Sequence, residues 1–199
     1  MALRFVALDL GNVLCDLDRQ AFPRALALAA GVSFDDAVRA FDEDAWRELE
    51  VGALDAGGFR GAVLTRLGRP VPDDVFDEAW NLIPTARAGA DALVARLALP
   101  HAIWSNTDPI HADHLARSLS CMASAVHLHL SHQARARKPT RSYYERGLAA
   151  LGASAAEVLF VDDRPENRDG ARALGIVVEA VETLAELERA LRKHGVLRG

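Results

Sequence analysis

Residues 4–14 read RFVALDLGNVL, an apolar run that gives way abruptly to polar residues. The run Arg4–Leu8 has the length and composition of a buried strand, and it stops at Asp9. Two later apolar runs stop in the same way, at Ser105 and at Asp162. Open α/β sheets bind ligands in the crevice beyond the carboxyl ends of their parallel strands. We therefore expect these three polar residues to converge in one crevice.

The chain around these residues alternates apolar runs with helical patterns. The predicted strands are residues 4–8, 102–104, 126–130, 158–161 and 176–181. The predicted helices that accompany them are residues 87–97, 110–119, 142–151, 166–174 and 184–194. Val126–Leu130 alternates apolar residues with histidines, which is typical of a half-exposed strand near a sheet edge. The alternation predicts an α/β protein with a Rossmann-like parallel sheet and helices on both faces.

Residues 16–84 break this alternation, because their pattern is helical only. The predicted helices are residues 20–30, 34–49, 56–67 and 73–81. An insert placed directly after the first strand can cover the carboxyl ends of the sheet. We therefore predict a core formed by residues 1–15 and 85–199, and a small all-helical cap domain formed by residues 16–84.

Composition excludes several classes of partner. The 23 basic and 28 acidic residues give a formal net charge of −5, which disfavours binding to nucleic acid or to an anionic membrane. No apolar run approaches the roughly 20 residues that span a bilayer. Cys15 and Cys121 are too few for a disulfide framework. We expect a cytoplasmic protein with a small-molecule partner, and the oligomeric state stays open.

Four segments carry the polar residues that matter together. They are Asp9–Leu14, Trp104–Thr107, Arg137–Pro139 and Phe160–Asn167. Their order and spacing resemble the four motifs of the haloacid dehalogenase superfamily, and the helical insert is similar to the C1 cap of that superfamily. The resemblance covers essentially the whole chain. The first motif, DLGNVL, is also similar to that of bacterial glucose-1-phosphate phosphatases and of the N-terminal phosphatase domains of soluble epoxide hydrolases.

The resemblance implies a magnesium-dependent phosphatase that acts on a small phosphate ester, such as a sugar phosphate, with Asp9 as nucleophile. A carboxylate can form an acyl phosphate that water then hydrolyses, which divides one hard step into two. Mg²⁺ needs only one or two carboxylates besides water and substrate oxygens. The implied metal group is Asp9, Asp163 and the backbone carbonyl of Gly11, together with Asp162. The resemblance implies that Asp162 and Asn167 would orient ligand waters and Lys138 from behind the ligands.

The substrate phosphate would be held by the other motifs. Ser105 and the backbone N–H of Asn106 would bind phosphate oxygens, and Lys138 would neutralise both the phosphate and the nucleophile. The Gly11–Asn12 loop completes the implied substrate-binding group. Ser105 and Lys138 therefore count as catalytic residues together with the nucleophilic aspartate.

Gly11 is a departure from the superfamily pattern, which places a second aspartate there as general acid and base. Such a group typically contributes about 10² to 10⁴ in rate. Three outcomes stay open: a slow enzyme, a preference for acidic leaving groups, or another residue in the same role. Asp16, at the predicted mouth of the cap, is the candidate catalytic substitute.

Each motif residue also has a structural explanation when it is taken alone. Asp9 could be a turn residue, Ser105 or Asp163 a helix cap, and Lys138 a surface lysine. Their joint placement at strand ends favours a site. The histidines at 127 and 129 are better explained as an exposed strand face than as zinc ligands.

Two other functions stay open. One is a 2-haloacid dehalogenase, which uses the aspartate on carbon and needs no Mg²⁺. The pair Asp162 and Asp163 disfavours it, because uncompensated carboxylates repel a carboxylate substrate. The other is a catalytically weak protein that binds a phosphorylated metabolite and regulates another process.

Overall fold

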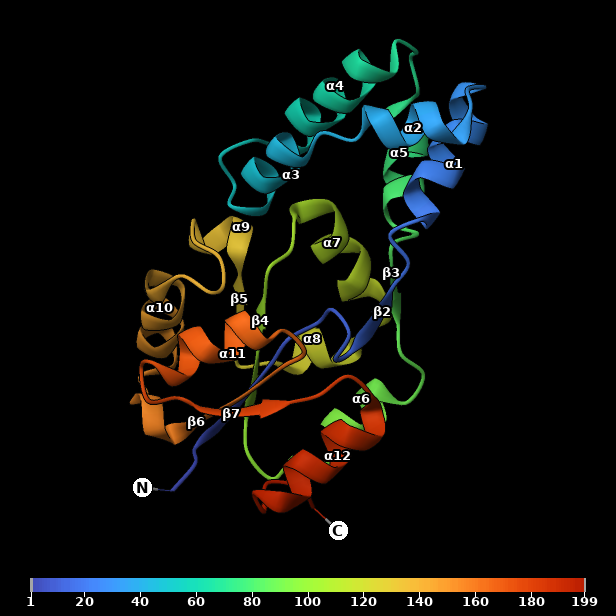
Figure 1. Cartoon of the computed structure of the whole chain (residues 1–199). Coiled ribbons are helices and arrows are strands. Elements are labelled where there is room, and N and C mark those ends of the chain that lie inside the picture. Colours follow the sequence, from blue (N-terminus) through green and yellow to red (C-terminus); the bar gives the residue numbers. More distant parts are fainter. Residues whose placement is uncertain (1, 199) are drawn as a thin grey trace.

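A computed structural model describes residues 2–198. Its centre is a five-stranded sheet in the order β5-β4-β1-β6-β7, with every neighbouring pair parallel (Figure 1). The strands are β1 Phe5–Leu8, β4 His101–Ser105, β5 His127–Leu130, β6 Val158–Asp162 and β7 Val177–Ala180. The predicted α/β class with a parallel sheet is confirmed, as is the position of β5 at a sheet edge.

Both faces of the sheet are covered because successive strand residues point to opposite sides. Val6 and Leu8 pack in one apolar cluster, whereas Ala7 packs in another. The helices of the first cluster are α6 Ala90–Val94, α7 Pro109–Ser118, α8 Ser120–Ser124 and α12 Leu184–Lys193. Those of the second are α10 Arg141–Leu151 and α11 Pro165–Arg172. Two short elements, α9 Ser131–Ala134 and the 3₁₀ turn Ala155–Glu157, follow β5 and precede β6.

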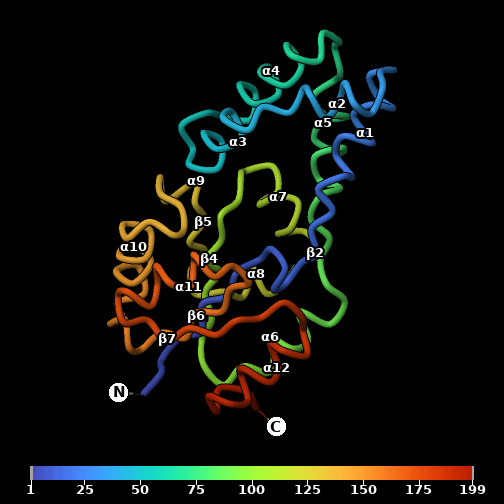
Figure 2. The backbone as a smooth tube through the Cα atoms, viewed as in Figure 1, coloured from blue at the N-terminus to red at the C-terminus, as the bar shows by residue number. Residues whose placement is uncertain are grey.

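A second body of helices stands over the carboxyl ends of the strands (Figure 1). These helices are α1 Ala21–Ala30, α2 Phe34–Ala40, α3 Glu43–Glu50, α4 Ala56–Leu67 and α5 Asp73–Trp80. They have their own core, in which Phe22, Phe59, Phe76 and Trp80 make edge-on and tilted ring contacts with centroids 4.8–5.8 Å apart. Figure 2 shows the chain reaching this body and returning from it along two adjacent segments.

Those two segments are strands, which the sequence pattern did not predict. β2 (Cys15–Leu17) and β3 (Pro84–Ala86) pair antiparallel. The prediction of helix alone for residues 16–84 was therefore wrong at both ends, since runs of three residues are too short to show a strand period. The predicted boundaries fall inside these strands, and the division into core and cap stays a prediction.

Two predicted helices also differ from the structure. Residues 34–49 form two helices, because Asp42 leaves the helical conformation and its side chain accepts a hydrogen bond of 3.1 Å from Ala45 N, capping α3. The helix predicted at residues 87–97 is reduced to α6, which starts after Gly89 in the left-handed region (φ 90°). Within residues 2–198, no helix has the length and apolarity needed to cross a membrane.

Candidate active site

Asp9 lies directly after β1 and is 6 % exposed. Its Oδ1 accepts a hydrogen bond of 2.8 Å from Leu10 N and lies 2.9 Å from the Nζ of Lys138. Burial raises the pKa of Asp9 to about 7; Lys138 lowers that pKa and the nearby Asp162 raises it. A cation at this point therefore favours the ionised, nucleophilic form.

Lys138 is buried, contrary to the surface position that it would have if taken alone. Its Nζ donates to the backbone oxygen of Trp104 at 2.9 Å and to Asp162 Oδ2 at 2.6 Å, besides its contact with Asp9. Burial by itself would lower the pKa of Lys138, but the carboxylates of Asp162 and Asp9 outweigh burial and raise it. The ammonium group is therefore fixed in its charged form between the two strand-end carboxylates.

Asn106 positions this lysine from the neighbouring strand. Its Oδ1 accepts a hydrogen bond of 2.8 Å from Lys138 N, and its Nδ2 donates to Lys138 O at 3.0 Å. Ser105 is 2 % exposed, and within residues 2–198 its hydroxyl makes only a long contact of 3.5 Å with Asn106 O. That hydroxyl is therefore available to a ligand.

Ser131 holds the same loop and was not found from the sequence. Its Oγ accepts a hydrogen bond of 2.9 Å from Thr107 N and donates to Thr107 O at 3.0 Å. Ser131 begins α9 directly after β5, so its position at a strand end was the available signal.

Asp9, Asp162 and Asp163 each offer an oxygen within 4.8 Å of the others. Both oxygens of Asp162 are occupied, because Oδ1 accepts from Arg164 N at 2.9 Å and Asn167 Nδ2 lies 3.0–3.1 Å from both. Asp163 Oδ2 accepts a single hydrogen bond of 2.9 Å from Asn12 Nδ2. An all-oxygen donor set fits a hard cation such as Mg²⁺. Asp9 and Asp163 have oxygens with fewer hydrogen-bond partners and can bind a cation, whereas Asp162 is better placed to hold Lys138.

Asp16 is not brought into this group. It is absent from the cavity wall, its side chain is 67 % exposed, and Oδ1 lies 2.7 Å from Arg87 Nε. The same arginine donates to Asn12 O at 2.7 Å. Asp16 therefore braces the loop after β1 from outside, and the structure contradicts its expected place at a reacting group.

A cavity of about 440 Å³ opens above the strand-end residues. Asp9, Gly11, Asn12, Ser105, Asn106, Asp163 and Asn167 all line it. The helical body above supplies Phe22, Phe41, Trp46 and Trp80 to its wall, together with the buried carboxyl group of Glu50. Glu50 was missed, because it ends the polar helix EDAWRELE and nothing local distinguishes it from an exposed glutamate.

A buried polar cluster joins α5 to α7 at the side of this cavity. Asp108 caps α7, lies 2.9 Å from His111 Nδ1 and accepts from Trp80 Nε1 at 3.2 Å. The other ring nitrogen of His111 lies 2.9 Å from Trp80 O. A carbonyl can only accept, so Nε2 carries a proton, and the Asp108 carboxylate beside Nδ1 raises the pKa of His111 and favours its doubly protonated form.

His129 was expected on an exposed strand face, and this expectation was wrong. It is 5 % exposed, its Nε2 lies 2.8 Å from Tyr143 O, and Tyr143 Oη donates to His129 O. The packing of α10 against β5 covers it.

The family model for haloacid dehalogenase-like hydrolases matches residues 3–175. This chain belongs to that family. A haloacid dehalogenase family enzyme of Bacteroides thetaiotaomicron, solved with magnesium and inorganic phosphate, is 23 % identical with a TM-score of 0.81, over 90 % of this chain and 94 % of that chain. A predicted family hydrolase of Porphyromonas gingivalis is 23 % identical with a TM-score of 0.82, over 96 % and 99 %.

The L-2-haloacid dehalogenase of Xanthobacter autotrophicus, solved with covalently bound chloropropionic acid, is more distant in structure. It is 24 % identical with a TM-score of 0.64, over 98 % of this chain and 84 % of that chain. At these identities the likeness concerns the fold, and the reaction has to be argued from the site.

Proposed function

We propose that this chain is a magnesium-dependent phosphatase that hydrolyses a small phosphate monoester through an aspartyl phosphate on Asp9. The observation that carries the proposal is the buried strand-end group in which Lys138 lies 2.9 Å from Asp9, with Asp163 beside it. Acyl phosphate chemistry needs a carboxylate nucleophile and concentrated positive charge around the transferring group. Asp9 supplies the nucleophile and Lys138 one positive charge, and Mg²⁺ bound at the acidic cluster would supply the rest.

The residues divide the work by position. Asp9 attacks phosphorus, while the Ser105 hydroxyl and the Asn106 N–H hold the phosphate oxygens. Lys138, whose Nζ contacts Trp104 O, Asp162 and Asp9, supplies positive charge beside them. Mg²⁺ held by Asp9, Asp163 and the Gly11 carbonyl would neutralise the charge that the carboxylates and phosphate bring together. Asp162 and Asn167 keep Lys138 oriented.

The acidic cluster favours phosphate over 2-haloacid substrates. A dehalogenase must bind a substrate carboxylate, and Asp162 with Asp163 would repel it unless a cation intervened. The magnesium and phosphate in the Bacteroides enzyme support the phosphatase proposal for a protein of this shape. The proposed substrate class is a small phosphorylated metabolite, and the subgroup resemblance stays a prediction.

Asp9→Asn tests the proposal. We expect at least a roughly 10³-fold loss of 4-nitrophenyl phosphate hydrolysis, because a carboxamide cannot form the acyl phosphate. A chelator should abolish wild-type activity and added Mg²⁺ should restore it. Asp169→Asn is the matched control, because Asp169 is an exposed residue of α11 outside the cavity.

Mass spectrometry must show that the carboxamide introduced by Asp9→Asn has not deamidated back to a carboxylate. Substantial activity in an intact, folded Asp9→Asn protein would refute the nucleophile assignment. Turnover of 2-chloropropionate with full activity in excess chelator would instead establish the dehalogenase.

A further inference from the structure

Glu50, the last residue of α3, is a buried carboxyl group in the wall of the active-site cavity. It is 4 % exposed, and its Oε2 has no hydrogen-bond partner among the described residues. Arg137 Nη2 lies 3.2 Å from Oε2, but not in hydrogen-bonding geometry. Burial and the missing hydrogen bond disfavour the ionised form of this carboxyl group, whereas the nearby Arg137 guanidinium favours it; on balance the pKa of Glu50 is raised. Such a group is placed to exchange a proton with a ligand.

Other titratable groups of the cavity wall are already engaged. Both ring nitrogens of His111 are bonded, and Asp108 accepts three contacts. Glu43 is exposed at the rim and paired with Arg47 at 2.7 Å. Cys15 donates its thiol to Leu10 O, and burial raises its pKa to about 12. None of these four is free to protonate a leaving group.

Glu50 also lies on the appropriate side of the cavity. Its neighbour Arg137 directly precedes Lys138, whose Nζ contacts Asp9. α3 contacts α9 and faces the strand ends from the helical body above (Figure 1). A phosphate held by the strand-end residues would direct its ester oxygen towards this helical side.

We propose that Glu50 is the proton donor to the leaving group, in the role of the acid that is missing at Gly11. This inference rests on the proposed phosphatase function. As an Asp9 oxygen bonds to phosphorus, the ester P–O bond breaks and its electron pair goes to the ester oxygen, which takes the proton of Glu50 and leaves as an alcohol. The Glu50 carboxylate then takes a proton from a water whose oxygen bonds to phosphorus. The bond between phosphorus and Asp9 breaks, which releases inorganic phosphate and restores the Asp9 carboxylate and the protonated Glu50.

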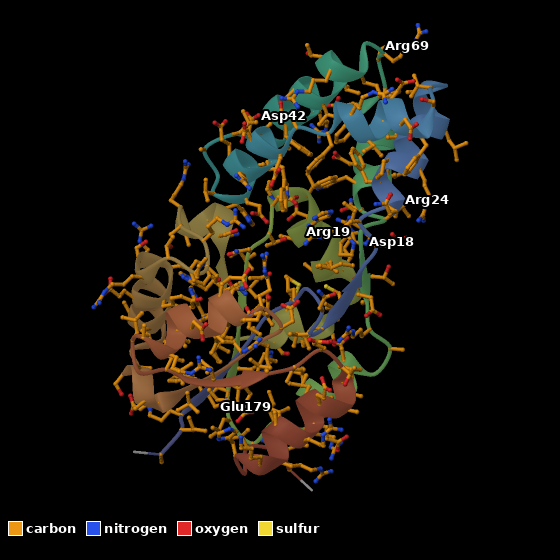
Figure 3. The ribbon with its side chains drawn as sticks, in the orientation of Figure 1. Asp18, Arg19, Arg24, Asp42, Arg69 and Glu179 are labelled. Atoms are coloured by element: carbon orange, nitrogen blue, oxygen red, sulfur yellow. The ribbon has the colours of Figure 1, made fainter. Side chains whose placement is uncertain are left out.

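The surrounding charges set the pH range of this step. Burial raises the pKa of Glu50, Arg137 lowers it, and Asp108 raises it. The charged groups around Glu50 are Arg137, Asp108, Arg19, Arg164 and His111. Arg19 follows β2 at the exposed rim and is labelled in Figure 3 beside Asp18. Because the protonated form acts, proton donation should decline as pH rises through the pKa of Glu50.

Glu50→Gln tests the proposal with two substrates of similar shape, 4-nitrophenyl phosphate and 4-nitrobenzyl phosphate. The nitrophenolate leaves without a proton, whereas the benzyl alkoxide needs one. We expect kcat/KM to fall about 100-fold for the benzyl ester and less than about threefold for the phenyl ester. For each ester, kcat/KM reports only the steps up to release of the alcohol, so the later attack of water on the aspartyl phosphate does not affect it. The decline of benzyl ester kcat/KM with rising pH should also disappear.

Glu48→Gln is the matched control, since Glu48 is exposed on the same helix and outside the cavity. Equal losses for both esters, or none, in a folded Glu50→Gln protein would overturn the proton-donor role. If the variant does not fold, the wild-type pH profiles decide, because a pH decline shared by both esters contradicts the proposal. Failure of the phosphatase proposal gives a different result. In that case the Asp9→Asn protein, in which Glu50 is intact, would still hydrolyse the phosphate esters.

Discussion

The absence of a general acid at Gly11 can be tested by placing an acidic side chain there, because a Cβ at this position meets only one close neighbour among the described residues. Its backbone is not in the left-handed region, unlike that of Asn12 (φ 54°). A Cβ at position 11 would meet Leu17 Cδ1 at 3.0 Å, and that atom is the end of a flexible side chain. A shift of a few tenths of an ångström in this side chain therefore accommodates a Cβ at position 11.

Gly11→Asp should raise kcat/KM for 4-nitrobenzyl phosphate about tenfold and change that for 4-nitrophenyl phosphate little. The reason is that the new carboxyl group adds a proton donor that only the poor leaving group needs. Gly11→Asn is the control of equal size without an acid. An identical response of the two variants would show that the effect comes from shape and not from proton transfer.

The strand-end residues were predictable, whereas the residues that act from the helical body were not. Asp9 and Ser105 follow from motif position, because the sheet brings the ends of β1 and β4 together, and Lys138 follows from its motif in the loop after α9. Asp16 was placed wrongly, since its pairing with Arg87 is a contact over 71 positions that no local pattern contains. The position of Glu50 in the cavity wall likewise depends on the packing of α3 over α9, which no local pattern contains.

At the scale of elements, α7 is joined to α5 by the buried Asp108–His111 pair. Burial alone would raise the pKa of Asp108 and lower that of His111. The attraction and hydrogen bonds between the two groups outweigh burial, so the pKa of Asp108 is lowered and that of His111 is raised. The contribution of His111 to stability is therefore complete below its unfolded value near 6.5 and lost as pH rises through its folded pKa. That of Asp108 is present above 3.8 and lost as pH falls through its own folded pKa.

Asp108→Ala should lower the free energy of unfolding by about 3 kcal/mol or more at pH 6, because it breaks a buried ion pair and removes the cap of α7. Urea unfolding measures the change. The difference from wild type should shrink as pH rises above 6.5. Asp113→Ala, an exposed change on the same helix, should cost less than about 0.5 kcal/mol. A loss for Asp108→Ala that is equally small would mean that the pair contributes little.

Element boundaries differed from the predictions where side chains, and not periodicity, set the backbone. The apolar runs of β1 and β6 were found because burial on both faces makes them continuous. The break between α2 and α3 comes from one capping side chain, Asp42, inside a segment with a helical pattern. Periodicity counts apolar positions and does not register such a cap.

At the scale of the whole molecule, the cavity has the strand-end carboxylates on one side and, on the other, the aromatic side chains of the helical body together with Glu50. The apolar clusters of the sheet lie below the strand-end carboxylates, and the separate cluster of α1–α5 lies above. The wall therefore changes from Asp9 and Asp163 to Phe41 and Trp46 across one cavity. A phosphate group and a less polar leaving group can each meet a matching surface.

We expect the concentration of carboxylates to make global stability depend on Mg²⁺. Without a cation, Asp9, Asp162 and Asp163 share one place, with Lys138 as their buried counter-charge. A ligand that binds only the native state stabilises it by about 2.7 kcal/mol at 100 times its Kd. For a chain of 199 residues this corresponds to a rise in Tm of about 5–10 °C. We therefore expect Mg²⁺ to raise the Tm of the wild-type protein.

Asp163→Asn should remove most of this Mg²⁺-dependent rise, because Asp163 has the carboxylate with the fewest partners in the cluster. Asp169→Asn, exposed on the helix that follows, should retain it. Removing one of three crowded carboxylates should also leave the metal-free Tm equal to or above that of wild type, since like-charge repulsion is relieved. Thermal melts with and without Mg²⁺ separate the two effects without any substrate. A full Mg²⁺ response in Asp163→Asn would place the ion elsewhere, whereas a lower metal-free Tm would show that Asp163 contributes more through Asn12 than it costs by repulsion.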